Sequence, residues 1–223
     1  MAPVAIDVNL VLDTVAVDDG VLSERGLGGA WVTANASRTD DPAAHDARLG
    51  RDLSGSETLR PVPVLVPPTG TTGAYARARE IVHSAQFHVV RLCPTGHRYP
   101  LADWVLSPIP ELCERQSFTL LLDFAPADVP WLEAVAFARA FPSVPMVVLG
   151  VGDERAAPAA LDAAPNLILH LDGTISAELV ATYGGSRFVA ASETADLPGR
   201  DRELILQRNA EALADGSYAE QWL

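Results

Sequence analysis

Short apolar runs alternate with amphipathic segments along the whole chain. Eight of these runs are bounded by Gly, Pro, Asp or Ser and are almost continuously hydrophobic, which is typical of strands that are buried on both faces. The expected strands are Val4–Val11, Gly29–Thr33, Arg60–Val66, His88–Leu92, Thr119–Phe124, Pro145–Leu149, Asn166–Leu171 and Arg187–Ala191. Strands of this kind indicate a parallel sheet covered by helices.

The segments between these strands predict helices. Asp128 is expected to cap the helix that begins after it, with Pro130 in the first turn. The expected helices are Val17–Arg25, Pro42–Leu53, Thr72–Ser84, Ser107–Gln116, Trp131–Ala140, Ala156–Ala163, Ile175–Tyr183 and Asp201–Leu213. Each strand is therefore followed by a helix, and the pattern is repeated eight times.

This alternation predicts an α/β fold with parallel strands and right-handed crossovers. Eight units favour a closed (β/α)8 TIM barrel, and without a break in composition we expect a single domain over residues 1–223. The alternative is an open doubly wound sheet, which usually has a glycine-rich loop after its first strand. Here the first strand is followed by no glycine before Gly20.

Composition narrows the function classes. The net charge of −13 and the pI near 4.6 argue against nucleic-acid partners and against anionic membrane surfaces. All 16 basic residues are arginine, so the chain has no lysine for Schiff-base chemistry. Two cysteines, Cys93 and Cys113, provide no disulfide framework, and the apolar start of the chain is interrupted by Asp7 and Asn9. We expect a cytoplasmic protein.

Five segments carry a resemblance to a known family. They are Phe141–Gly152, Pro165–Gly173, Gly185–Glu193, the helix Ile205–Leu213, and Val90–Pro94 followed by Ser107–Glu114. In this order, they resemble strand and helix signatures of the amidohydrolase-related, metal-dependent hydrolases. The resemblance covers nearly the whole chain and implies the same (β/α)8 barrel. It also implies that a homodimer is to be expected.

The resemblance implies a divalent metal, usually zinc, that activates water for hydrolysis. The family's first-strand Asp-x-His-x-His signature corresponds here to Asp7, Asn9 and Val11. Its fifth-strand and sixth-strand histidine positions correspond to Asp123 and Gly150. All the expected imidazole ligands are absent, so we assign no metal ligand and expect no zinc cofactor.

One family position keeps a carboxylate, because Glu193 stands where the eighth strand has aspartate. The oxygen set Asn9, Asp123 and Glu193 leaves open a hard divalent ion such as magnesium or calcium. Without a metal, Asp123 and Glu193 can act across the barrel mouth as general acid and base. The alternative is that they are hydrated or paired with arginine, for instance with Arg91.

Other polar residues lie at the expected strand ends, where such barrels place their sites. His170 and Asp172 share one strand face; His170 is a candidate catalytic residue or a barrel histidine with satisfied hydrogen bonds. Cys93 and His97 can form a nucleophile pair or be a buried thiol and a loop histidine. The candidate substrate-binding residues are Asp7, Cys93, His97, Asp172 and Ser192.

Three functional hypotheses follow from these residues. The first is a barrel with a degenerate metal site, either a pseudoenzyme or a protein that binds a small molecule. The second is an active hydrolase or lyase that uses Asp123 and Glu193, assisted by Asn9, Arg91 and His170. The third is a structural subunit of a larger assembly.

Overall fold

The strands lie close to their expected bounds. The computed structural model describes residues 5–13, 22, 27–67, 72–84, 87–125, 127–151, 154–171, 177–190 and 199–218 of the 223-residue chain. Neighbouring strands pair in parallel, in the orders β1-β2-β3 and β4-β5-β6-β7-β8-β9. Their bounds are β1 (Ala5–Leu12), β2 (Leu27–Ala34), β3 (Leu59–Pro61), β4 (Val64–Leu65), β5 (Val89–Leu92), β6 (Thr119–Leu122), β7 (Met146–Val151), β8 (Leu167–Leu171) and β9 (Phe188–Val189).

The expected third strand, Arg60–Val66, is divided into β3 and β4. Pro61 and Pro63 have no backbone N–H, so neither can donate to a ladder there. Pairing continues on both sides of the break, because Val62 N donates to Val32 O at 2.8 Å and Pro63 O accepts from Arg91 N at 2.9 Å. One barrel strand thus passes from the three-stranded sheet to the six-stranded sheet.

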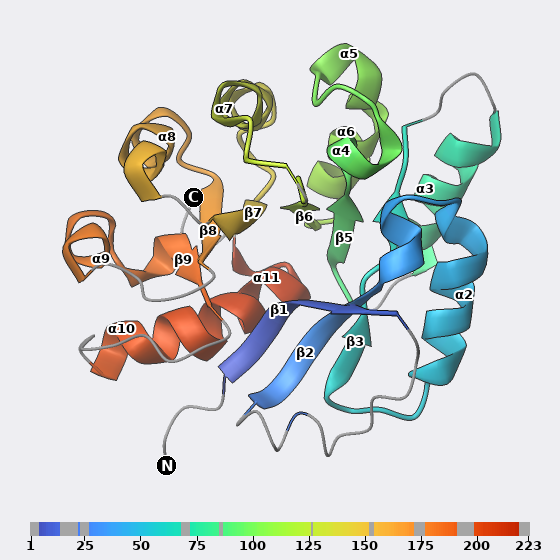
Figure 1. The fold of residues 1–223 in the computed structure, drawn as a ribbon, viewed down its shortest axis with the longest axis horizontal. Coiled ribbons are helices and arrows are strands. Elements are labelled where there is room, and N and C mark those ends of the chain that lie inside the picture. Colours follow the sequence, from blue (N-terminus) through green and yellow to red (C-terminus); the bar gives the residue numbers. More distant parts are fainter. Residues whose placement is uncertain are drawn as a thin grey trace.

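Helices surround the strands in Figure 1, and most of them match the predicted segments. They are α2 (Pro42–Asp52), α3 (Thr72–Ser84), α4 (Pro94–His97), α5 (Asp103–Leu106), α6 (Pro108–Arg115), α7 (Trp131–Ala140), α8 (Ala157–Ala163), α9 (Ala177–Tyr183), α10 (Gly199–Glu203) and α11 (Asn209–Asp215). Short turns are η1 (Asn35–Arg38), η2 (Glu154–Ala156), η3 (Gly185–Arg187) and the π-helical η4 (Leu204–Arg208).

Two of the helix predictions are not confirmed. The prediction that Asp128 caps α7 is wrong, because Pro130 occupies the N-cap position and makes no side-chain capping bond. The expected helix Val17–Arg25 falls outside the described residues, apart from Leu22. No helix in the described ranges is both long and apolar enough to cross a membrane.

Alternate strand residues form two apolar layers. One layer lies between the strands and the helices, and Leu120, Leu122 and Val148 belong to it. The other fills the centre of the barrel and takes at least one residue from each of the eight barrel strands, among them Val8, Trp31, Val62, Val89, Leu121, Val147, Ile168 and Val189. Because these residues share one contiguous cluster, the strands enclose a packed lumen as a (β/α)8 barrel requires.

The C-terminal helices complete the lumen between the first and last strands. Figure 1 shows α10 and α11 beside β9 and β1, and η4 contacts both strands. Leu213 belongs to the central cluster, and its carbonyl accepts from Thr119 Oγ1 at 3.0 Å. Ala190 N, at the end of β9, donates to Ile205 O at 3.2 Å. The last helical segment is therefore part of the barrel core.

Three polar residues from the motifs that carry the resemblance hold backbone turns together. Asn166 Nδ2 lies 2.9–3.0 Å from the carbonyls of Ala138, Phe141 and Val144, at the end of α7. Arg187 donates to the carbonyls of Leu161, Ala164 and Leu167. Asn209 Nδ2 donates to Gly185 O and Phe188 O. These motif positions serve the fold, because they satisfy carbonyls at helix and strand ends.

Candidate functional site

A cavity of about 720 Å³ opens at the carboxyl ends of the strands, where barrel proteins place their sites. Its apolar wall includes Val129, Trp131 and Leu149, and no histidine lines it. Among the described residues, the lining is formed by Asn9, Val11, Arg38, Asp123, Ala125, Ala127, Asp128, Val129, Trp131, Leu149, Gly150, Val151, Arg155 and Ala156. Four positions that the resemblance equates with metal ligands therefore meet at one cavity: Asn9, Val11, Asp123 and Gly150.

Asp123 follows β6 and is the best-connected residue of this cavity. Its Oδ1 accepts from Arg38 Nη2 at 3.0 Å and from Ala125 N at 3.1 Å. Its Oδ2 accepts from Arg38 Nε at 2.8 Å and from Arg91 Nη1 at 3.2 Å. A carboxylate has about four acceptor positions, and these four bonds fill them. The predicted alternative, pairing of Asp123 with Arg91, is confirmed.

Arg91 lies on β5 and is fully buried, with a side-chain exposure of 0%. Burial lowers the pKa of this guanidinium, and the charge of Asp123 opposes that effect. Arg91 Nη2 also donates to Asn9 Oδ1 at 3.1 Å, which joins β5 to β1. Asn9, Arg38, Arg91 and Asp123 thus form one connected network, which we call the mouth lattice.

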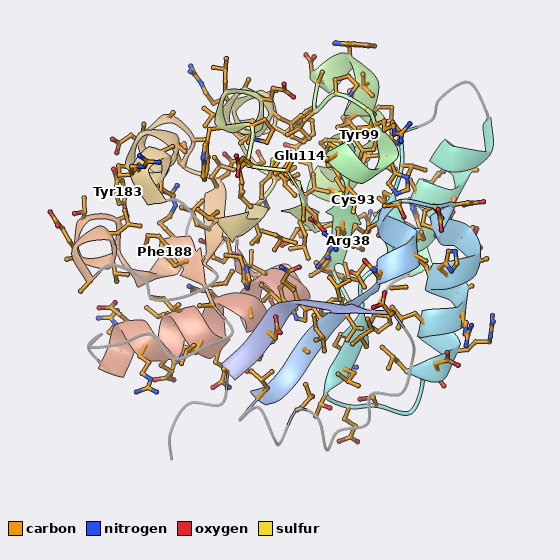
Figure 2. All side chains as sticks on the ribbon, viewed as in Figure 1. Arg38, Cys93, Tyr99, Glu114, Tyr183 and Phe188 are labelled. Carbon is orange, nitrogen blue, oxygen red and sulfur yellow. The ribbon has the colours of Figure 1, made fainter. Side chains whose placement is uncertain are left out.

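Arg38 reaches the mouth from η1, directly after β2 (Figure 2). Its backbone is held in place by neighbours on both sides. Ser37 Oγ donates to Asp46 Oδ1 at 2.6 Å, and the Ser37 carbonyl accepts from His97 Nε2 at 2.9 Å. Gly96 packs against the Arg38 carbonyl so closely that a Cβ at Gly96 would lie 1.9 Å from that oxygen. The guanidinium of Arg38 is therefore presented by a rigid turn.

Cys93 and His97 do not form an activated nucleophile. Cys93 is 2% exposed, and burial raises the pKa of its thiol to about 12, with the charge of Asp123 adding to the effect. A thiol with such a pKa is protonated at neutral pH and is a poor nucleophile. His97 contacts the Ser37 carbonyl and stacks on Tyr99 at a centroid distance of 6.5 Å. Its expected contact with a substrate stays a prediction.

His170 faces the lumen, two residues after the lumen residue Ile168 on β8. It is 2% exposed, and burial lowers its pKa from 6.5 to about 4, while nearby Asp7 opposes this shift and Arg91 adds to it. His170 is therefore a neutral imidazole at pH 7. Asp7 Oδ1 accepts from the Asn9 backbone N–H at 2.8 Å, at the point where the register of β1 against β2 shifts.

Three predicted site residues, Asp172, Ser192 and Glu193, lie outside the described residues. Other cavity residues were missed from the sequence, above all Arg38, Trp131 and Arg155. A signal for Arg38 was present, because the polar stretch Asn35–Arg38 directly follows an apolar strand and so falls at the mouth. Nothing comparable distinguishes Arg155 from the other exposed arginines.

Comparison with known proteins shows the fold. The chain matches no protein-family model and no curated protein. An uncharacterised TIM-barrel protein from Bordetella bronchiseptica superposes with a TM-score of 0.72 at 15% identity, over 97% of this chain and 99% of that one. A putative amidohydrolase from Staphylococcus aureus has a TM-score of 0.66 at 12% identity, over 96% and 99% of the two chains. The chain therefore has an amidohydrolase-like (β/α)8-barrel fold.

One further neighbour of this fold contains a metal. It is a 5-carboxyvanillate decarboxylase from Novosphingobium aromaticivorans, in complex with manganese and 4-hydroxy-3-methoxy-5-nitrobenzoic acid. It has a TM-score of 0.62 at 11% identity, over 95% of each chain. This similarity extends the shared fold to barrels that hold a divalent ion.

The described mouth residues of this amidohydrolase-like barrel do not fit such an ion. Among them, no three His, Cys, Asp or Glu side chains gather closely enough to hold one. Asp123 has its acceptor positions filled by two guanidiniums and an amide. Among the described residues, the buried Arg91 Nε has no hydrogen-bond partner. This atom is a hydrogen-bond donor, so an added group at this point would have to be an acceptor and not a cation.

Proposed function

We propose that this amidohydrolase-like barrel binds a small organic molecule at its mouth and that it is not a zinc hydrolase. The observation that carries the proposal is the cavity of about 720 Å³ at the strand ends, whose central carboxylate has its acceptor positions filled. Cavities of several hundred Å³ with apolar walls and a few fixed polar groups are typical of small-molecule sites. The protein is then a binding barrel or pseudoenzyme.

The lining favours an organic acid as the ligand. Trp131, Val129 and Leu149 provide an apolar wall, and Arg38 and Arg155 place guanidinium groups on the same cavity. Guanidinium groups bind carboxylates strongly and with defined geometry. The manganese-containing decarboxylase of the same fold holds a substituted benzoic acid, which lends this ligand class further support.

A hydrolase or lyase working through Asp123 has less support. A general base needs a free lone pair directed at the proton that it removes. In Asp123 both carboxylate oxygens already accept two hydrogen bonds each. Asp123 is better described as a positioning residue that orients Arg38 and Arg91.

A panel of small carboxylic acids tests the proposal. We expect aromatic acids of the size of benzoate to raise the melting temperature, whereas the matched neutral amides do not, because the site stabilises the folded state only when it is occupied. Calorimetric titration then measures the affinity of the acids that respond. Equal responses to the acids and to their amides would exclude charge recognition, and no response to either would contradict the proposal.

Variants locate the bound acid. Trp131→Ala and Arg155→Gln remove the apolar wall and a lining charge, so each should weaken binding by about tenfold, which corresponds to about 1.4 kcal/mol. Arg115→Gln is the matched control, because Arg115 is exposed on α6 and does not line the cavity. An acid bound equally well by all three variants would lie elsewhere on the protein.

A further inference from the structure

We propose that the guanidinium groups of Arg38 and Arg91 are the resident cations of the barrel mouth and hold its two sheets together there without a divalent metal. This inference rests on the mouth lattice and is independent of the ligand proposed above. It gives Asn9 and Asp123, which stand at ligand positions of the resemblance, arginine partners in place of a metal.

The lattice links the two sheets of the barrel. Asn9 on β1 and Arg38 after β2 belong to the three-stranded sheet, whereas Arg91 on β5 and Asp123 after β6 belong to the six-stranded sheet. The bonds Arg38–Asp123 and Arg91–Asn9 join residues that are 85 and 82 positions apart in the chain. Both bonds therefore cross from one sheet to the other.

Charge keeps a metal ion out of this lattice. Two guanidiniums lie within 3.2 Å of the single Asp123 carboxylate, and Arg91 is fully buried. A divalent cation at Asp123 would have to displace hydrogen bonds already made and would face two like charges in a low-dielectric site. The charge of Arg91 is therefore not screened by direct contact with solvent.

The lattice is also assembled before any ligand arrives. Arg38 has only 20% of its side chain exposed, and its turn is fixed by the Ser37–Asp46 and His97–Ser37 hydrogen bonds. The entropy of ordering a long arginine side chain is thus largely compensated by the fold. A mouth that needed a metal to order it would not require this support.

Metal analysis of the full-length wild-type protein is the first test. The protein is treated with a chelator, exposed to excess Mn²⁺ or Zn²⁺, separated by gel filtration and analysed for bound metal and melting temperature. We expect no stoichiometric metal and the same melting temperature in chelator and in metal. One equivalent of metal, lost together with stability in chelator, would overturn the proposal whatever the protein does with organic acids.

Asp123→Asn provides the second test, in metal-free buffer. In an arginine-held mouth this change leaves Arg91 buried without its counter-charge, so the melting temperature should fall by roughly 6 °C or more. In an empty metal site the same change would relieve carboxylate repulsion, and the melting temperature would stay the same or rise. That second outcome would overturn the proposal.

Two further variants keep this test decisive. Arg38→Met removes the more accessible guanidinium, so it should fold and melt at a lower temperature than the wild type, with or without metal. Glu111→Gln breaks the exposed Arg115–Glu111 pair, 3.7 Å apart on α6, and should leave the melting temperature unchanged. If Asp123→Asn does not fold, Arg38→Met decides: an unchanged melting temperature in chelator would overturn the proposal.

Discussion

Several buried polar residues of this barrel have fixed hydrogen-bond partners. In the mouth lattice, Asp123 is bonded to Arg38 and Arg91, and Arg91 in turn to Asn9. Away from the mouth, buried Asn166 binds three carbonyls at the end of α7. Such satisfied groups give specificity and order, because a buried polar group without partners is costly.

The buried histidine makes stability depend on pH. The pKa of His170 is about 4 in the folded protein against 6.5 in the unfolded chain, so only the unfolded chain binds a proton there between these values. Its contribution to stability is complete above pH 6.5 and is lost as pH falls through this window, by about 3 kcal/mol at most. Urea unfolding of the wild type and of His170→Gln at several pH values between about 7 and 4 measures it.

The comparison uses the slope of stability against pH, so an overall stability change in His170→Gln does not matter. We expect the variant to lose less free energy of unfolding than the wild type as pH falls. His83→Gln, at an exposed histidine of α3, should follow the wild type. Parallel curves for the wild type and His170→Gln would show that the pKa of His170 is the same in the folded and unfolded states.

Short elements place Arg38 at the barrel mouth. The turn η1 presents Arg38, and the single-turn helix α4 holds η1 from behind through Gly96 and His97. Neither element was predicted, because segments of four residues carry no hydrophobic period. Their position was predictable only in general terms, as loops that follow strands on the functional face of a barrel.

Gly96→Ala tests this support of η1. The new Cβ would lie 1.9 Å from the Arg38 carbonyl oxygen and 3.0 Å from its carbon, so η1 or α4 must move. Such overpacking should lower the free energy of unfolding by about 2 kcal/mol or more. It should also weaken binding of any acid held by Arg38. Chemical unfolding and calorimetric titration measure the two effects.

Gly50→Ala is the matched control, because nothing lies within 4 Å of a Cβ at Gly50 in α2. Alanine is the better helix former, so this variant should gain about 0.5–1 kcal/mol. A Gly96→Ala protein as stable as the wild type would mean that α4 does not constrain Arg38.

Buried elements were the ones that the sequence predicted best. Strands buried on both faces were recognised because their apolar runs are continuous, and α7 begins and ends at the expected residues. The split of Arg60–Val66 was missed, although Pro61 and Pro63 are the cause and were visible. At the mouth, the pairing of Asp123 with Arg91 was among the alternatives. The second partner, Arg38, depends on contacts between residues 85 positions apart.

At the scale of the whole molecule, one central cluster joins all eight barrel strands to the C-terminal helix. The pattern of eight alternating units predicted this barrel correctly. It did not predict that α11 contributes to the lumen. An amphipathic helix has the same sequence pattern whether it covers the outside of a barrel or closes one end.

Leu213→Ala tests this closure. Leu213 is fully buried in the central cluster, so its truncation leaves a cavity in contact with several strands. We expect a loss of about 2–5 kcal/mol in the free energy of unfolding, measured with urea. Leu132→Ala, at a leucine that is 86% exposed on α7, should change stability by less than about 0.5 kcal/mol. Similar values for both variants would show that α11 is dispensable for the core.

The backbone of Gly150 bears on what it would take to build a metal site into this barrel. Gly150 lines the cavity at an irregular point of β7, with φ of +68°, and stands where the resemblance places a histidine. A histidine is disfavoured in that conformation, so restoring the residue alone would not restore the ligand. A histidine introduced at Gly150 would therefore meet both backbone strain and the positive charge of Arg38 and Arg91. An engineer who wanted to build a metal site at this mouth would need to redesign β7 and the arginines together.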